Sequence, residues 1–121
     1  MITHLVCATR EGLVGHQTAS GYTIDRIVPF VALPSTRALH RFVRVTRPST
    51  PQYTTLAIVL DVGPWNEHDD DYVFGDARPS AESGIDSRGR KTNRAGIDLS
   101  EKVWAMLHMT DNASVEWSFL E

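Results

Sequence analysis

Short apolar segments alternate with polar, turn-forming clusters along the chain, and this pattern predicts a protein built mainly of β-strands. Near the end, Val115, Trp117 and Phe119 alternate with polar residues, as expected of a strand with one buried face and one solvated face. Residues 56–60 are continuously apolar, which suits a strand in the middle of a closed barrel. Six strands are predicted, over residues 2–8, 27–33, 42–47, 54–62, 94–97 and 113–120.

One helix is predicted between the last two strands. Asp98 and Glu101 have the spacing of a capping box, and Ser100 is a second candidate N-cap. Trp104, beside the apolar face of this helix, and Trp117, on the last strand, are predicted core residues. The helix is amphipathic because four apolar residues fall on one face: Leu99, Val103, Met106 and Leu107.

A long polar segment, residues 66–93, separates the fourth and fifth predicted strands. Its glycines, its proline and its many charges predict a surface loop, and a loop of this length is often functional. The run from His68 to Asp71 resembles a metal-binding cluster, but it lacks the alternating oxygen ligands and the glycine of a calcium loop. No other histidine or cysteine lies at zinc-ligand spacing. We therefore predict neither a metal site nor a cofactor.

The chain is long enough for one compact domain, residues 1–121. Because 41% of its 121 residues are hydrophobic, it can build one core without disulfides, and the single cysteine, Cys7, excludes an internal one. The net charge of −3 disfavours nucleic acid and anionic membrane surfaces as partners. No segment approaches the roughly 20 apolar residues of a membrane span.

Four short motifs carry a resemblance to a known family. In their order, spacing and predicted secondary structure they resemble the pattern of the rare-lipoprotein-A family, and Val43-Arg44-Val45 lies between the second and third motifs as that pattern requires. The resemblance runs from about residue 15 to residue 120. Expansins and family 45 endoglucanases share the same barrel more distantly. The motifs are Thr18-Ala19-Ser20-Gly21, Ala32-Leu33-Pro34, Asp61-Val62-Gly63-Pro64 and Gly96-Ile97-Asp98-Leu99-Ser100.

The resemblance implies an all-β fold, a six-stranded double-psi β-barrel with one short helix and a long surface loop. It also implies a groove for polysaccharide, with peptidoglycan glycan strands as the first candidate, and it places Asp98 at the groove floor and Asp61 nearby. In related catalytic barrels the residue matching Asp98 protonates the glycosidic oxygen. The chemistry agrees, because burial and a neighbouring negative charge both raise a carboxyl pKa and keep the acid form near neutral pH. Lytic-transglycosylase-like cleavage needs only one such acid/base residue.

Further groups of the predicted groove come from the first motif, the residues after it and the long loop. Asp25 follows the first motif at the distance where the family has an aspartate. Trp65 directly follows the third motif, where it can stack on a sugar ring. Two positions depart from the family pattern. Tyr22 stands where the family has a glutamate, and Phe30 lies near the position where the family has a histidine. The candidate ligand-binding residues are Thr18, Ser20, Tyr22, Asp25, Trp65 and Asn93.

Two functions therefore remain open. One is an enzyme that cleaves glycan strands, and the other is a non-catalytic glycan-binding or structural module of a phage or a secretion system. Asp98 has a second interpretation as a helix cap, and Asp61 has one as a turn former that bonds its own backbone. Trp65 has a second interpretation as a residue buried under the long loop.

The first ten residues carry no visible export signal, since a basic leader followed by a long apolar run is missing. Cytoplasmic synthesis is expected. Delivery to a cell wall would then require lysis, a phage particle or a specialised secretion machine.

Overall fold

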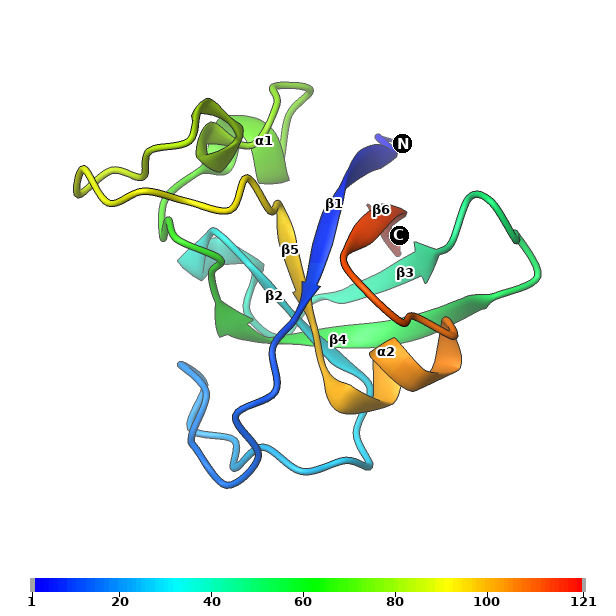
Figure 1. The fold of residues 1–121 in the computed structure, drawn as a ribbon. Helices are drawn as coiled ribbons and strands as arrows, with labels where there is room; N and C mark the ends of the chain where they lie inside the picture. The colour runs from blue at the N-terminus through cyan, green and yellow to red at the C-terminus, as the bar shows by residue number, and fades with distance from the viewer. Residues whose placement is uncertain (1, 121) are drawn as a thin grey trace.

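The computed structural model describes residues 2–120, which form a closed barrel of six strands (Figure 1). The strand order around the barrel is β1-β5-β2-β4-β3-β6. The β1/β5 and β2/β4 pairs are parallel, and the other four pairs are antiparallel. The predicted all-β class and the six strands are therefore confirmed. The strands are β1 (His4–Arg10), β2 (Phe30–Leu33), β3 (Phe42–Thr46), β4 (Thr54–Val62), β5 (Ile97–Leu99) and β6 (Ala113–Phe119).

The strand bounds differ from the predicted ones mainly in β2 and β5. β2 begins three residues later than predicted, because Ile27 belongs to a turn and its side chain is 75% exposed. β5 covers residues 97–99, not 94–97, because its ladder to β1 begins at Ile97. β4 spans the predicted residues, although its side chains alternate between buried and exposed and Leu56 remains 47% exposed.

The helix between the last two strands is α2 (Glu101–Met106), and its N-cap is Ser100. The Ser100 hydroxyl accepts a hydrogen bond from the Val103 backbone N–H at 3.3 Å. Asp98 lies inside strand β5, so the interpretation of Asp98 as the helix cap is wrong. The Asp98 carboxyl is therefore not held by the helix N-terminus.

The core fills the barrel with the inward side chains of all six strands. Trp117 is fully buried, and Trp104, a residue of α2, is also buried, as predicted. The Trp117 indole N–H donates to the Tyr72 hydroxyl at 2.8 Å, and the Tyr72 hydroxyl donates to the Gly96 carbonyl at 2.9 Å. A residue of the long polar segment thus shares the core with the barrel strands.

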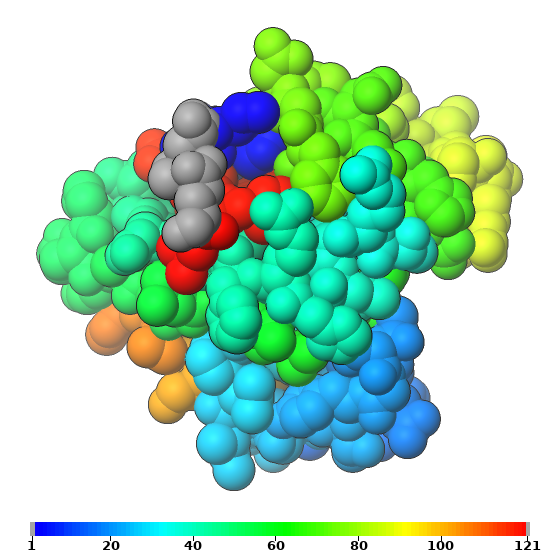
Figure 2. All heavy atoms as spheres, turned by 180° about the vertical axis from the view of Figure 1, so that it is seen from behind, coloured from blue at the N-terminus to red at the C-terminus, as the bar shows by residue number. Residues whose placement is uncertain are grey.

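The long segment is therefore more ordered than its composition predicts, and we call residues 66–93 the lobe. It contains helix α1 (Asp70–Val73) and a 3-10 helix at Ser80–Ser83; a second 3-10 helix lies outside it, at Thr36–Ala38. The prediction of a surface loop is wrong for Tyr72, Val73 and Ala81, which are buried. The lobe projects beyond one end of the barrel in Figure 1, and Figure 2 shows its green-to-yellow surface standing out at one side.

Within residues 2–120, no helix has the length and apolar character needed to cross a membrane.

Candidate functional site

Strand pairing places the two predicted aspartates level with each other. In the ladder, Thr9 of β1 pairs with Asp98 of β5, Asp98 pairs with Ala32 of β2, and Ala32 pairs with Asp61 of β4. A bulge between Val31 and Ala32 shifts the register, so that Ala32 lies opposite Asp61. Since neighbouring strands are about 4.8 Å apart, the two aspartate backbones are about 10 Å apart, with one strand between them.

Asp98 is half-buried and lines an open groove on this side of the barrel. The Thr9 hydroxyl donates a hydrogen bond to its Oδ1 atom. Burial raises the pKa of Asp98 to about 6, and the negative charge of Asp61 adds to this effect, whereas the Thr9 hydrogen bond opposes it. Asp98 can therefore exist in both its acid and its base form near neutral pH, as a general acid/base requires.

The third motif passes next to Asp98. Gly63 has a φ of 141°, a backbone conformation that side chains rarely adopt, and an added Cβ atom there would lie 4.0 Å from Asp98 Oδ2. In the same motif, Asp61 Oδ1 accepts backbone N–H bonds from Ala19 at 2.8 Å and from Val62 at 2.9 Å. The turn-forming role of Asp61 and its position beside Asp98 thus occur together.

Glu11 is an acidic residue of this site that the sequence reasoning missed. Its backbone N–H donates to the Leu99 carbonyl at 2.8 Å, which extends the contact between β1 and β5 by one residue. Its Oε2 atom is buried, and no N–H group or hydroxyl among residues 2–120 donates a hydrogen bond to it. Burial raises the pKa of Glu11 to about 9, and a hydrogen bond with Asp61 and the charges of Asp61 and Asp98 add to it.

A pKa of about 9 keeps the Glu11 carboxyl in its acid form at neutral pH, and this form can donate a hydrogen bond to Asp61, because two carboxyl groups can hydrogen-bond only when one of them is protonated. A signal for Glu11 existed in the sequence. Thr9 and Glu11 are two residues apart, so an extension of the first predicted strand beyond residue 8 would have placed both on the same face.

Trp65 and Asn93 stand beside Asp98 in the groove. The Trp65 indole N–H donates to Asn93 Oδ1 at 2.9 Å, and the Arg90 guanidinium lies 5.9 Å from the Trp65 ring centre. Trp65 is half-buried, so part of its surface is available to a ligand. The residues that line the groove are Thr9, Arg10, Pro64, Trp65, Asn93, Asp98 and Asn112.

Four other predicted ligand residues bond to one another instead of lining this groove. The Thr18 and Ser20 hydroxyls are 2.8 Å apart, and the Tyr22 hydroxyl donates to Asp25 at 2.6 Å. Asp25 also accepts the backbone N–H of Ile27 at 2.8 Å, which makes it a turn residue. The backbone of this loop reaches the site at one point, the Ala19 N–H on Asp61.

The acidic run of the lobe has structural partners. Asp69 accepts the Ser80 N–H at 2.7 Å and the Ser80 hydroxyl at 2.9 Å. Asp70 accepts the Ser35 hydroxyl at 2.5 Å and the Arg37 guanidinium at 3.1 Å. In the part of the chain that the structure describes, no group of three or more histidine, cysteine, aspartate or glutamate side chains is placed to hold a metal ion.

Comparisons with known proteins identify the fold. A family model with the description "Domain of unknown function (DUF8814)" matches residues 2–81. No curated protein matches the sequence significantly. The crystal structure of an apo expansin of Clavibacter michiganensis is similar over 99% of this chain and 51% of its own, with a TM-score of 0.57 and 17% identity. This likeness confirms the predicted double-psi β-barrel, and the chain spans about half the length of that expansin.

Proposed function

Since this chain belongs to the family described as Domain of unknown function (DUF8814), a description that names no activity, we propose its function from the groove itself. We propose that the protein binds polysaccharide in the groove around Asp98 and cleaves its glycosidic bonds. Glycan strands of peptidoglycan are the first candidate substrate, and Asp98 is the general acid/base.

One observation carries this proposal. Asp98 is half-buried and lines an open groove, and its pKa is raised to about 6. Cleavage of a glycosidic bond requires a carboxyl group that is protonated near neutral pH and can reach the leaving oxygen. The half-exposed Trp65 beside it offers an aromatic face on which a sugar ring can stack.

The proposed reaction uses the two forms of Asp98 in turn. The Asp98 carboxylic acid gives its proton to the glycosidic oxygen while the bond from that oxygen to the anomeric carbon breaks. The resulting Asp98 carboxylate then removes the proton from a hydroxyl of the same sugar, whose oxygen attacks the anomeric carbon. Asp98 ends protonated, and the products are an anhydro sugar end and a free hydroxyl, so no water is consumed.

The neighbouring residues adjust Asp98 in this scheme. Thr9 holds one carboxyl oxygen and leaves the other for the substrate. The proton on Glu11 removes one negative charge from the group of three carboxyls. Among the neighbouring charges, that of Asp61 then has the main effect on the pKa of Asp98. With both neighbours ionised, the Asp98 proton would be bound too tightly for rapid transfer at neutral pH.

The test compares the wild type with Asp98→Asn on purified glycan strands and on soluble β-1,4-linked N-acetylglucosamine oligomers. Mass spectrometry of the products distinguishes anhydro ends from hydrolysed reducing ends. Asp98→Asn should lower product formation by about 10²–10⁴-fold, the usual contribution of a general acid/base. The matched control is Asp76→Asn, because Asp76 is exposed and lies outside the groove. Equal product release by wild type and Asp98→Asn would remove Asp98 from the mechanism.

A second candidate is a non-catalytic module that holds glycan in the same groove. Two observations favour it: Phe30 is fully buried, and the Tyr22 hydroxyl is engaged by Asp25, so neither position supplies an acid or a base to the groove. This candidate predicts measurable glycan binding with no product for either the wild type or Asp98→Asn.

A further inference from the structure

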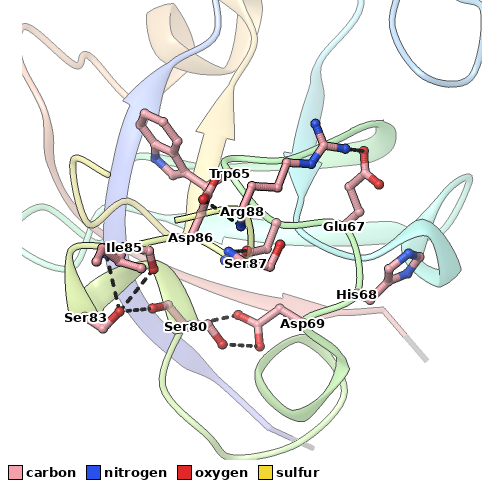
Figure 3. A pocket seen from close by; sticks show the side chains of 11 residues that line it. Trp65, Glu67, His68, Asp69, Ser80, Ser83, Ile85, Asp86, Ser87 and Arg88 are labelled. Carbon is pink, nitrogen blue, oxygen red and sulfur yellow. Dashed lines mark hydrogen bonds and ion pairs between the residues drawn. The ribbon is translucent and has the colours of Figure 1, made fainter. Parts of the chain in front are cut away.

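The lobe contains a second cavity, which we call the lobe pocket (Figure 3). Its volume is about 360 Å³, within the size range of small-ligand sites. Figure 3 shows the Glu67 and Arg88 side chains on one side and the Asp69 and Ser80 side chains on the opposite side. Ile85, whose side chain is 58% exposed, adds an apolar surface to the pocket.

The walls of the lobe pocket are fixed by contacts within the lobe. Asp69 uses both carboxyl oxygens to hold Ser80. Asp86 accepts the Arg88 and Arg90 backbone N–H groups at 2.9 and 2.8 Å and binds the Arg90 guanidinium at 2.6 Å. The pocket is therefore formed before any ligand arrives, which lowers the entropic cost of binding.

Most acidic groups that line the lobe pocket already have partners. Asp86 binds the Arg90 guanidinium, Asp69 uses both oxygens on Ser80, and Glu67 lies 3.9 Å from the exposed Arg88. The buried group without a partner is a neutral amide. The Asn66 side chain is 6% exposed; its Oδ1 accepts the Ser87 N–H at 2.9 Å, which fixes the amide orientation, and its Nδ2 finds no acceptor among residues 2–120. A buried donor without a partner favours a ligand oxygen that would supply the missing acceptor.

Trp65 connects the lobe pocket to the groove, because it lines both. In Figure 3 its ring points away from the polar walls of the pocket. Its indole N–H is bonded to Asn93 in the groove, while its carbonyl accepts the Arg90 guanidinium from the lobe at 3.2 Å. A chain molecule that leaves the groove past Trp65 therefore comes next to the lobe pocket.

We propose that the lobe pocket is a second subsite for the polysaccharide, and that it binds a neutral sugar unit beyond those in the groove. This inference rests on the proposed function. A sugar unit fits the chemistry of the pocket, because its hydroxyl or amide oxygens offer acceptors to Asn66 and its C–H surface can cover Ile85. The lobe then makes recognition depend on the length of the glycan.

The experiment measures affinity against chain length. The Asp98→Asn protein serves as the background, so that oligomers stay intact, and calorimetry compares the disaccharide with the hexasaccharide of β-1,4-linked N-acetylglucosamine. The hexasaccharide should bind about tenfold more tightly, as expected for the extra hydrogen bond and apolar contact. Asn66→Asp replaces the free donor by an acceptor of the same shape and should remove most of this gain. Ile85→Ala should remove part of it, and as an exposed position it leaves the fold intact. Asp76→Asn is again the matched control.

Three outcomes decide the inference. A length-dependent gain that both lobe variants reduce, with disaccharide binding unchanged, supports it. A gain that neither variant changes overturns it while leaving the groove proposal in place. Absence of binding for both oligomers in every protein, together with absence of products from the wild type, overturns the proposed function as well.

Discussion

The barrel groove and the lobe hold their side chains in place by different means. Around the groove, Asp98 and its neighbour Asp61 stand in one row across paired strands, so the backbone ladder sets their spacing. In the lobe, Asp69 and Asp86 bind backbone N–H groups of short loops, and Tyr72 links the lobe to the barrel core. The difference teaches that positions in the groove are insensitive to the loss of one contact, whereas positions in the lobe depend on a few contacts each.

The largest effect is expected where the two regions share the core. Trp117→Ala should lower the free energy of unfolding by about 3–5 kcal/mol, because it leaves a cavity and removes the donor to Tyr72. Chemical denaturation monitored by circular dichroism measures this change. Ile85→Ala, at an exposed position of the lobe, should stay within about 0.5 kcal/mol of the wild type. Similar losses of unfolding free energy for both variants would contradict this difference between the barrel core and the lobe.

A smaller effect is expected from the link itself. Tyr72→Phe leaves the Trp117 indole N–H without its acceptor and the Gly96 carbonyl without its donor, which should cost about 2 kcal/mol. Hydrogen exchange should rise across the lobe more than across the strands. Tyr53→Phe is the matched control, because Tyr53 is half-buried and lies outside the lobe. Uniform exchange throughout Tyr72→Phe would contradict the role of Tyr72 as the link.

The smallest effect concerns the groove and depends on pH. The folded-state pKa of Glu11, about 9, is above its usual 4.5, so the folded protein holds a proton that the unfolded chain releases, and stability falls as pH rises through this window. Between pH 7 and 9 the loss should be about 1–2 kcal/mol. In Glu11→Gln this slope should disappear, because the amide keeps a neutral donor for Asp61. Denaturation midpoints at pH 7, 8 and 9 provide the check, and parallel slopes in the two proteins would show that Glu11 is ionised in the folded state.

The fold and the site could be predicted from the sequence to different extents, for different physical reasons. β4 was predicted to the residue because a long apolar run ends at turn residues on both sides. The closeness of Asp61 and Asp98 followed only from the family resemblance, since it depends on strand order and on the bulge at Val31 and Ala32. No local pattern encodes such long-range register.

Two residues show where local patterns failed. Glu11 was missed because the first predicted strand ends at residue 8, and because its neighbours Asp61 and Asp98 are distant in sequence. Tyr72 was hidden by the average composition of the polar lobe, which a single buried aromatic residue barely changes.

Four predicted ligand residues remain candidates from the resemblance alone, and in the structure they bond within their own loop. They are Thr18, Ser20, Tyr22 and Asp25.

The proton held by Glu11 also changes how the whole molecule moves in an electric field. The sequence gives a net charge of −3 at pH 7 when every aspartate and glutamate is counted as ionised. With Glu11 neutral, the folded protein carries −3 + 1 = −2, while the unfolded chain carries the full −3. Native electrophoresis at pH 7 should therefore leave Glu11→Gln at the wild-type position, although its sequence has lost an acid, whereas the two proteins should separate once both are unfolded.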